Sequence, residues 1–229
     1  MRGILYIVAT PIGNLQDITL RAIQILENVD IIACEDTRKT GFLLQKLKIP
    51  KKAMLVSYYE ENELKRIPEI INYLKNGKNV ALVSNAGTPT VSDPGFKLVR
   101  ECVFQDIKVI PIPGPSAILT ALVASGFPTD KFLFLGYLPR KDLKRKKLLE
   151  NIKKLNFSCT LILFESPKRV IKLLGEIESI FGNVNIVLAK ELTKIFEEFF
   201  RGKVREFIKI FEKSPPRGEI TVLFNIPPK

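Results

Sequence analysis

The sequence predicts an α/β protein of two α/β domains, the first with a parallel sheet flanked by helices and the second with a mixed sheet. Three observations predict this fold class. Short apolar runs alternate with amphipathic helix patterns through the first half, as in a parallel sheet covered on both faces. A stiff connector, PIPGPS at 111–116, then interrupts the alternation. Beyond it the loops are longer, so we expect domains of residues 1–112 and 113–229.

The individual elements follow from the apolar periodicity. In the first domain, strands are expected at 4–9, 31–34, 54–57, 80–84 and 109–112. Its expected helices span 19–26, 42–47 and 67–74, and Gly77 lies where the last of them should end. In the second domain, strands are expected at 132–135, 160–164, 186–189 and 220–224. Its expected helices span 117–124, 142–154, 168–181 and 204–212.

Composition and charge limit the classes of function. Hydrophobic residues make up 46% of the 229 residues, which is enough for packed cores, and no apolar run is long enough to cross a membrane. No signal peptide is recognisable, so we expect a cytoplasmic protein. The net charge is +12, and residues 116–229 hold 21 lysines and arginines against 12 acidic residues. This excess indicates a polyanionic partner, RNA or DNA first, unless the whole proteome is rich in lysine.

The chain contains no histidine, which removes the commonest general base and the commonest metal ligand. Its three cysteines, Cys34, Cys102 and Cys159, are widely spaced in apolar surroundings and form no CxxC motif. We therefore expect no metal site and no disulfide framework. Acid–base chemistry must use Asp, Glu, Lys, Tyr or Cys.

Four loops follow predicted strands of the first domain, at the edge where open parallel sheets bind ligands. Their sequences are TPIGN at 10–14, EDTRKTG at 35–41, SNAGTPTVSDPG at 84–95 and PIPGPSA at 111–117. In the second domain, FESPKR at 164–169 and AKELTK at 189–194 also follow apolar runs. The 84–95 loop combines two glycines with two prolines, which favours a binding loop. Ser92 or Asp93 would cap a helix that begins with Pro94.

Two charged segments allow either a functional or a structural interpretation. In EDTRKTG, the structural interpretation is the start of a helix, with acids before its first turn and Thr37 as its N-cap. This interpretation does not explain Arg38 and Lys39, because the helix dipole disfavours cations in the first turn. The run RKDLKRKK at 140–147 has six basic residues in eight. It is either a solvated helix face or a surface that follows nucleic-acid phosphates.

The six loop motifs, in this order, resemble those of the tetrapyrrole methylase superfamily, and within it the branch that acts on ribosomal RNA. The resemblance implies homodimers of two-domain chains that bind S-adenosylmethionine in a cleft between the domains. It also implies methylation of the ribose 2′-hydroxyl of a cytidine in 16S rRNA, either free or within the 30S subunit. A glycine-poor first loop suits a methyl donor that carries a sulfonium and no phosphate.

The resemblance also implies roles for residues at matching motif positions. Cofactor-binding residues would be Pro11, Ile12, Ala86, Gly87, Thr88, Val91, Ser116, Ala117, Glu165 and Ala189. Catalytic candidates are Glu35, Asp36, Glu191 and Lys194. Substrate-binding candidates are Arg38, Lys39, Arg140, Lys141, Lys168 and Arg169. No metal is expected, because transfer from a sulfonium needs alignment and exclusion of water rather than a Lewis acid.

The candidate carboxylates would accept the hydroxyl proton during or after transfer, and the cations would lower the hydroxyl pKa or hold phosphates. For Glu191 and Lys194, an ion pair on the surface is an equal alternative. Two positions depart from the family's pattern. Asn85 replaces an acid in NAGTP, and EENE at 60–63 lacks the histidine of the family's HNE.

Two other functions stay open. A small-molecule methylase of the same fold, acting on a tetrapyrrole, would usually show a glycine-rich GxGxGD loop where this chain has TPIGN. A non-catalytic RNA-binding or ribosome-assembly protein would keep the fold without binding the cofactor. The sequence shows no RRM or KH signature to support that third function.

Overall fold

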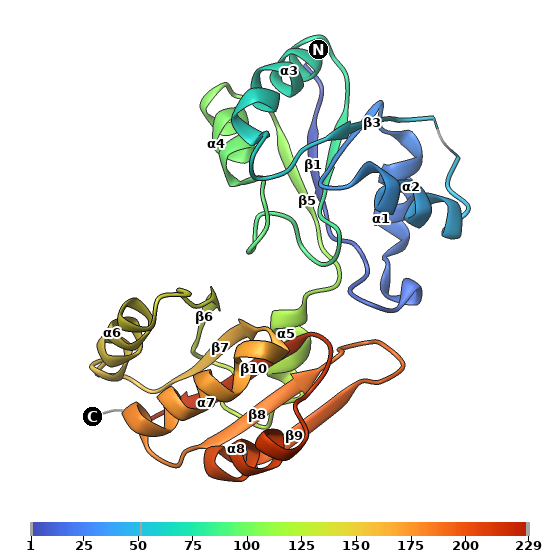
Figure 1. Ribbon diagram of the computed structural model, residues 1–229. Coiled ribbons are helices and arrows are strands. Elements are labelled where there is room, and N and C mark those ends of the chain that lie inside the picture. Colours follow the sequence, from blue (N-terminus) through green and yellow to red (C-terminus); the bar gives the residue numbers. More distant parts are fainter. Residues whose placement is uncertain (1, 51, 228–229) are drawn as a thin grey trace. The chain divides into compact units, whose positions relative to one another are not determined.

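The computed structural model describes residues 2–50 and 52–227. The chain divides into two compact units, Met1–Ser116 and Ala117–Lys229 (Figure 1). The boundary expected from the sequence, after residue 112, lies inside the same proline-rich connector. Each unit has its own sheet and its own hydrophobic core. Within the described residues, none of the helices has the length and apolar character that a membrane span requires.

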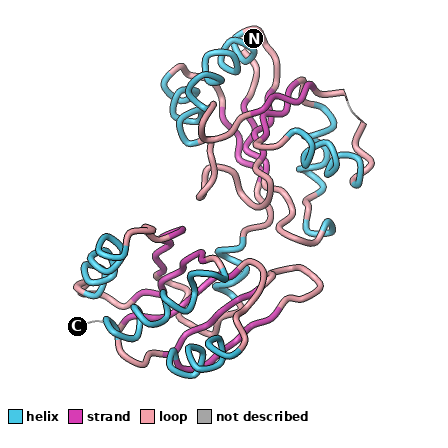
Figure 2. Tube along the Cα trace, viewed as in Figure 1, coloured by secondary structure: helices cyan, strands magenta, loops and turns pink. Residues whose placement is uncertain are grey.

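The first unit is built on a fully parallel five-stranded sheet in the order β3-β2-β4-β1-β5. Figure 2 draws strands in magenta, with helices in cyan on both sides of this sheet. The strands are β1 (Leu5–Val8), β2 (Ile31–Cys34), β3 (Met54–Ser57), β4 (Val80–Val83) and β5 (Val109–Ile112). Both β2 and β4 are buried along their whole length, as expected for central strands covered on both faces. Because all five run the same way, their carboxyl ends lie at one edge.

Helices cover both faces of this sheet. They are the 3-10 helix η1 (Leu15–Asp17), α1 (Leu20–Asn28), α2 (Thr37–Lys46), α3 (Glu63–Lys75) and α4 (Phe96–Phe104). Successive side chains of a strand point to opposite faces. Ile31 and Ala33 therefore pack with buried residues of α3 and α4, whereas Ile32 and Cys34 pack with those of α1 and α2. Figure 1 shows the two helix pairs on opposite sides of β1 and β5.

Two helix N-caps differ from those predicted from the sequence, and α2 and α3 begin five and four residues earlier than expected. Asp36, not Thr37, caps α2, because the Asp36 carboxylate accepts a hydrogen bond from the backbone nitrogen of Arg38. Helix α4 begins two residues later than expected, and Gly95, which has no side chain, is its N-cap in place of Ser92 or Asp93. The predicted end of α3 is confirmed, since Gly77 follows it with a φ of 80°.

The second unit has a mixed five-stranded sheet in the order β6-β7-β10-β8-β9. Its strands are β6 (Phe132–Tyr137), β7 (Cys159–Glu165), β8 (Asn185–Lys190), β9 (Glu198–Lys203) and β10 (Ile220–Ile226). Strands β6 and β7 are parallel, and all other neighbours are antiparallel. Strand β9, at one edge, was not predicted from the sequence.

Four helices complete the second unit: α5 (Ala117–Val123), α6 (Asp142–Lys153), α7 (Pro167–Phe181) and α8 (Val204–Lys213). Buried side chains of α6, α7 and α8 form one core with inward residues of β7, β8 and β10. Helix α5 instead contacts β10 outside that cluster. The loops after β7 and β8 carry the motifs that were singled out in this half of the sequence.

Candidate functional site

Direct hydrogen bonds join the loops at the carboxyl edge of the first sheet. Thr10, after β1, and Gly87, after β4, exchange two backbone hydrogen bonds of 2.9 Å each. The hydroxyl of Thr88 donates to the carbonyl oxygen of Pro115, after β5, over 3.2 Å. Three of the four predicted loops are therefore held together as one surface.

The fourth loop joins this surface through a carboxylate. Glu35, which follows β2, accepts a hydrogen bond from the backbone nitrogen of Asn85 over 2.8 Å. Asn85 stands where the family's pattern has an acid, and here its side chain is exposed. The contact to Glu35 uses the main chain, so it does not depend on which side chain stands at position 85.

A pocket of about 230 Å³ opens between the β1 loop, the start of α2 and the β4 loop. It is lined by Pro11, Ile12, Gly13, Leu15, Lys39, Thr40, Leu43, Ser84, Asn85 and Ala86. Three predicted cofactor-binding residues, Pro11, Ile12 and Ala86, and the predicted substrate-binding Lys39 thus lie around one cavity. The pocket wall is mostly apolar with a few polar groups, which is typical of a small-molecule site.

The backbone conformation at residue 87 favours glycine. Its φ is +80°, which other residues adopt with strain, whereas a Cβ there would lie 3.4 Å from Ile12 Cγ2, an ordinary van der Waals distance. Thr90 and Ser92, further along the same loop, also have positive φ values of 75° and 64°. Strained backbone of this kind is concentrated at ligand-binding segments of proteins.

Two carboxyls of this region have opposite pKa shifts. Hydrogen bonds from the side chain and backbone of Arg38 lower the pKa of Asp36 to about 2. Burial and the nearby charge of Glu35 raise the pKa of Asp93 to about 6. Asp93 is therefore the stronger base of the two near neutral pH. Asp93 is not among the site residues predicted from the sequence, although it is the only acid in the 84–95 loop.

Arg38 has a local partner in the structure. Its guanidinium donates to both carboxylate oxygens of Asp36, over 3.1 and 2.9 Å, while the arginine side chain stays 89% exposed. This pairing accounts for a cation in the first turn of α2, which the sequence left unexplained. Lys39 instead lines the pocket described above. A substrate-binding role of either residue stays a prediction.

The remaining predicted cofactor residues lie outside this pocket. Val91 is 39% exposed in the β4 loop, Ser116 ends the connector and Ala117 begins α5. In the second unit, Ala189 is buried within β8 and only 1% exposed. Glu165 ends β7, is 2% exposed and accepts a hydrogen bond from the backbone nitrogen of Ser166 over 2.8 Å. Their cofactor-binding roles stay predictions.

Glu191 and Lys194 form the ion pair that the sequence allowed. Lys194 Nζ lies 3.0 Å from Glu191 Oε1 and 3.0 Å from Glu219 Oε2. Glu191 Oε1 also accepts a hydrogen bond from the backbone nitrogen of Glu219 over 2.8 Å. A φ of 50° at Glu191 places this loop in a strained shape. These contacts hold the loop after β8, and a catalytic role of the pair stays a prediction.

One of the six basic residues in the 140–147 run is structural. Arg145 is 3% exposed and binds both carboxylate oxygens of Glu176 on α7. The other five are exposed: Arg140, Lys141, Lys144, Lys146 and Lys147. Lys168, at the start of α7, is exposed as well, whereas Arg169 pairs with Glu165 over 3.2 Å. A dense basic surface therefore surrounds the amino end of α6.

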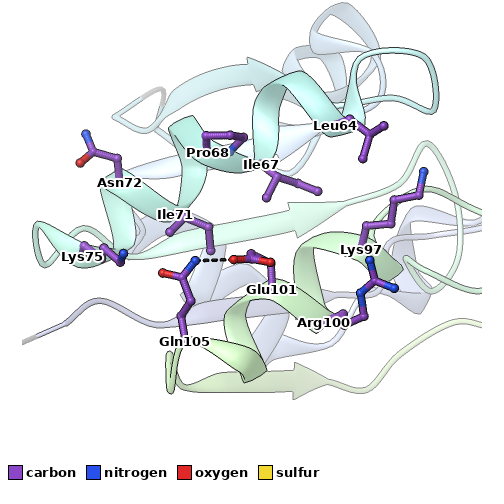
Figure 3. A pocket seen from close by; sticks show the side chains of 10 residues that line it. All are labelled: Leu64, Ile67, Pro68, Ile71, Asn72, Lys75, Lys97, Arg100, Glu101 and Gln105. Carbon is purple, nitrogen blue, oxygen red and sulfur yellow. Dashed lines mark hydrogen bonds between the residues drawn. The ribbon is translucent and has the colours of Figure 1, made fainter.

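The larger groove between α3 and α4, of about 580 Å³, lies away from these loops (Figure 3). Figure 3 shows apolar side chains such as Ile67 and Ile71 between the cations Lys75 and Arg100. It contains none of the residues predicted for the site. Across residues 2–50 and 52–227, the structure shows no cluster of His, Cys, Asp or Glu that would suit a metal ion.

Comparison with protein-family models matches residues 4–208 to the family described as Tetrapyrrole (Corrin/Porphyrin) Methylases. The chain belongs to the tetrapyrrole methylase family. The family predicted from the six loop motifs is thus confirmed, and so is the prediction that this tetrapyrrole methylase is a methyltransferase. Among its curated relatives, ribosomal RNA small subunit methyltransferase I of Thermotoga maritima is 51% identical over 223 residues, covering 97% of this chain and 98% of that protein.

Solved structures of other tetrapyrrole methylases share the fold. A cobalt precorrin-4 methyltransferase of cobalamin biosynthesis matches with a TM-score of 0.70 at 18% identity, covering 96% of this chain and 94% of that one. The uroporphyrin-III C-methyl transferase from Thermus thermophilus complexed with S-adenyl homocysteine matches with a TM-score of 0.64 at 15% identity, covering 97% of each chain. The predicted class of two α/β domains is confirmed.

Proposed function

We propose that this tetrapyrrole methylase uses S-adenosylmethionine to methylate the ribose 2′-hydroxyl of a cytidine in 16S rRNA. The observation that carries the proposal is the similarity, over nearly the whole chain, to proteins named ribosomal RNA small subunit methyltransferase I. The basic surplus of the second half and the glycine-poor first loop agree with it. We expect the enzyme to work in the cytoplasm as a homodimer.

The loops at the carboxyl edge of the first sheet suit the cofactor chemically. S-adenosylmethionine supplies an activated methyl group on a positively charged sulfur. Pro11 and Ile12 offer an apolar wall, and the strained backbone at Gly87 allows close approach of a ligand to the main chain. Two carboxyls, Glu35 and Asp93, add negative potential that favours a cationic ligand over a phosphate.

The chain's own groups must orient the ribose, exclude water and receive one proton. As the hydroxyl oxygen bonds to the methyl carbon, the carbon–sulfur bond breaks and the hydroxyl proton has to leave. Asp93, with its pKa near 6, is better suited to accept this proton than Asp36, whose pKa is about 2. We therefore add Asp93 to the candidates Glu35, Asp36 and Glu191.

We propose that the basic surface at the amino end of α6 binds the phosphates of the RNA. Five exposed cations lie within eight residues there, and Lys168 of α7 is exposed as well. Asp142, the one acid in this run, is bound by Arg145 and Lys172 at 3.0 and 2.6 Å, so its charge is balanced within the protein. The five cations therefore remain available for a polyanion.

Methyl transfer to defined acceptors tests the proposal. The purified chain is incubated with methyl-labelled S-adenosylmethionine and, in parallel, 30S subunits, protein-free 16S rRNA, 50S subunits and a uroporphyrinogen. The expected result is label in 16S rRNA, at one cytidine whose 3′ phosphodiester resists alkaline hydrolysis. Label confined to the tetrapyrrole would indicate a small-molecule methylase. Binding to 30S subunits without transfer or cofactor binding would indicate an assembly protein.

A further inference from the structure

Glu63, the first residue of α3, is a buried carboxylate whose partners come from three parts of the first unit. Its side chain is only 5% exposed, and its Oε2 lies 2.8 Å from Lys97 Nζ in α4. Its Oε1 accepts hydrogen bonds from the Tyr58 hydroxyl over 2.8 Å and from the Gly95 backbone nitrogen over 3.0 Å. From the start of α3, this side chain therefore ties together the residue that follows β3, the end of the 84–95 loop and α4.

The contact from Glu63 holds the backbone nitrogen of Gly95, the last residue of the loop, whose carbonyl oxygen accepts a hydrogen bond from the Val99 backbone nitrogen of α4 over 3.0 Å. Gly95 has a φ of +131°, and a Cβ there would lie 2.6 Å from Leu82 Cδ2 and 2.9 Å from Thr90 Cγ2. The position therefore requires glycine, which supplies no side chain to cap α4. The backbone shape at the end of this strained loop depends on a partner from outside it.

The charge states strengthen this contact. Burial alone would raise the pKa of Glu63, but hydrogen bonds from Lys97, Tyr58 and Gly95 outweigh it and hold that pKa below its ordinary value. Burial and the Glu63 charge raise the pKa of Tyr58, so its hydroxyl remains a donor. Hydrogen bonds to an ionised, desolvated acceptor are shorter and stronger than neutral ones. Lys97 itself lines the groove between α3 and α4 (Figure 3).

We propose that Glu63 is a positioning residue that, by holding Gly95, fixes the 84–95 loop in the shape that binds S-adenosylmethionine. This inference rests on the proposed function, because the loop carries the predicted cofactor residues Ala86, Gly87, Thr88 and Val91. Glu63 lines none of the pocket at the carboxyl edge and acts from the far end of the loop. Small displacements of such a loop matter, since a shift of ~1 Å in a binding group can cost ~100-fold in rate.

Two substitutions separate the reach of this side chain from its charge. Glu63→Gln keeps an acceptor oxygen at the same distance from Gly95 but loses the charge, and Glu63→Asp keeps the charge but is one methylene shorter. Positioning predicts that Glu63→Asp weakens S-adenosylmethionine binding about tenfold in calorimetric titration, whereas Glu63→Gln, which keeps the acceptor oxygen for Gly95 but loses the charge and the ion pair with Lys97, weakens it by a smaller factor. The KM for S-adenosylmethionine should rise in Glu63→Asp, with a smaller change in kcat.

Glu69 provides a matched control on the same helix. It accepts a hydrogen bond from the Tyr73 hydroxyl over 3.0 Å and pairs with Arg66 at 2.6 Å, and both of these residues lie on α3. Glu69→Asp and Glu69→Gln should leave cofactor affinity unchanged. Wild-type affinity in Glu63→Asp, or a larger loss in Glu63→Gln than in Glu63→Asp, would overturn the inference. So would equal losses of affinity in Glu63→Asp and Glu69→Asp.

Hydrogen exchange of the wild-type protein gives a second measurement that does not depend on how the variants fold. Without S-adenosylmethionine, the Gly95 amide should already be protected by its bond to Glu63. Exchange at the rate of an unstructured loop would overturn the inference. A wild-type chain that protects Gly95 but binds no S-adenosylmethionine would instead refute the proposed function.

Discussion

Arg145 and Glu176 form a buried, bidentate ion pair that fastens α6 to α7. Arg145 Nε lies 2.5 Å from Glu176 Oε2, and its NH2 atom lies 2.6 Å from Oε1. The same guanidinium donates to the carbonyl oxygens of Pro139 and Arg140 over 3.1 and 3.2 Å. The Arg145 guanidinium makes all of these bonds, and they join α7 to the segment just before α6. Arg145 therefore orients the 140–147 segment, which carries the exposed cations.

Removing this pair should destabilise the second unit. Arg145→Met leaves the Glu176 carboxylate buried without its cation, which typically costs about 3 kcal/mol of the free energy of unfolding. Urea denaturation followed by circular dichroism measures the difference. The exposed pair of Arg205 on α8 and Glu178 on α7 is the control, and Arg205→Met should cost less than about 1 kcal/mol. Similar losses in both variants would contradict the structural role of Arg145.

The exposed lysines of α6 should set the affinity for RNA. Replacing Lys141, Lys144 and Lys147 with Gln is expected to weaken binding to 16S rRNA and to flatten its dependence on salt, by roughly 0.7 in the log–log slope for each lost phosphate contact. Fluorescence anisotropy at several salt concentrations measures both quantities. Lys209→Gln and Lys213→Gln on α8 form the control. An unchanged slope in the α6 variant would place RNA elsewhere on the protein.

Asp93 should make stability depend on pH. The folded protein raises its pKa from near 4 to about 6, so its ionisation opposes folding. The folded protein favours the protonated form of Asp93. The stability that this form supports is fully present below about pH 4 and is lost as the pH rises through about 6. Asp93→Asn should therefore gain about 1 to 2 kcal/mol relative to wild type between pH 4 and pH 7, allowing for solvent screening.

Asp36 is the control for this pH dependence, because its pKa is shifted in the opposite direction from that of Asp93. Its pKa is lowered to about 2 by Arg38, so its contribution is present above about pH 4 and is lost only in stronger acid. Asp36→Asn should show no relative gain between pH 4 and pH 7. A parallel response of the two variants would mean that the shift at Asp93 does not arise from burial and Glu35.

The same substitution tests the proposed proton acceptor. At pH 7.5, Asp93→Asn is expected to lower kcat for methyl transfer about 100-fold, while the KM for S-adenosylmethionine changes little. Wild-type kcat should decrease as the pH falls below about 6, and the variant should lose that dependence. A variant with wild-type kcat would assign the proton to Glu35, Asp36 or Glu191.

Two glycines with almost the same φ separate backbone strain from cofactor contact. Gly87 and Gly126 have φ values of +80° and +81°, but a Cβ at Gly126 would meet nothing within 4 Å. Gly87→Ala and Gly126→Ala should each cost about 1 kcal/mol in the free energy of unfolding. Only Gly87→Ala should weaken S-adenosylmethionine binding, because its methyl group would lie against Ile12, which lines the pocket at the carboxyl edge. Equal affinities in both variants would remove residue 87 from the cofactor site.

The strands of the first unit could be predicted to within a residue or two because their apolar runs are short and sharply bounded. Strand β9 could not, since its sequence EFFRGK mixes charges and a glycine with two aromatics at the edge of the sheet. Helix α2 begins with TRKT, whose polar residues hide a helix that the apolar pattern only shows from Phe42 onward. Edge strands and polar first turns have weak periodicity, and tertiary contacts decide them.

The candidate site was partly predictable for a similar reason. The loops themselves could be found, because each follows an apolar run at the carboxyl end of a strand. The raised pKa of Asp93 could not, because it depends on burial in the folded chain and on Glu35, which is far away in the sequence and follows a different strand. The structural use of Arg145 was also hidden, since nothing in RKDLKRKK distinguishes the one buried arginine from its exposed neighbours.

The mutual backbone bonds between Thr10 and Gly87 have a consequence for protein engineering. Both bonds join main-chain atoms, so they do not depend on which side chains stand at the two positions. A chimera that receives only the TPIGN segment from a relative, or only the NAGTP segment, should keep this pairing as long as residue 87 remains glycine, whose φ of +80° the pairing uses. In recombination libraries, crossover points between these two segments should therefore be tolerated when both parents have glycine at position 87.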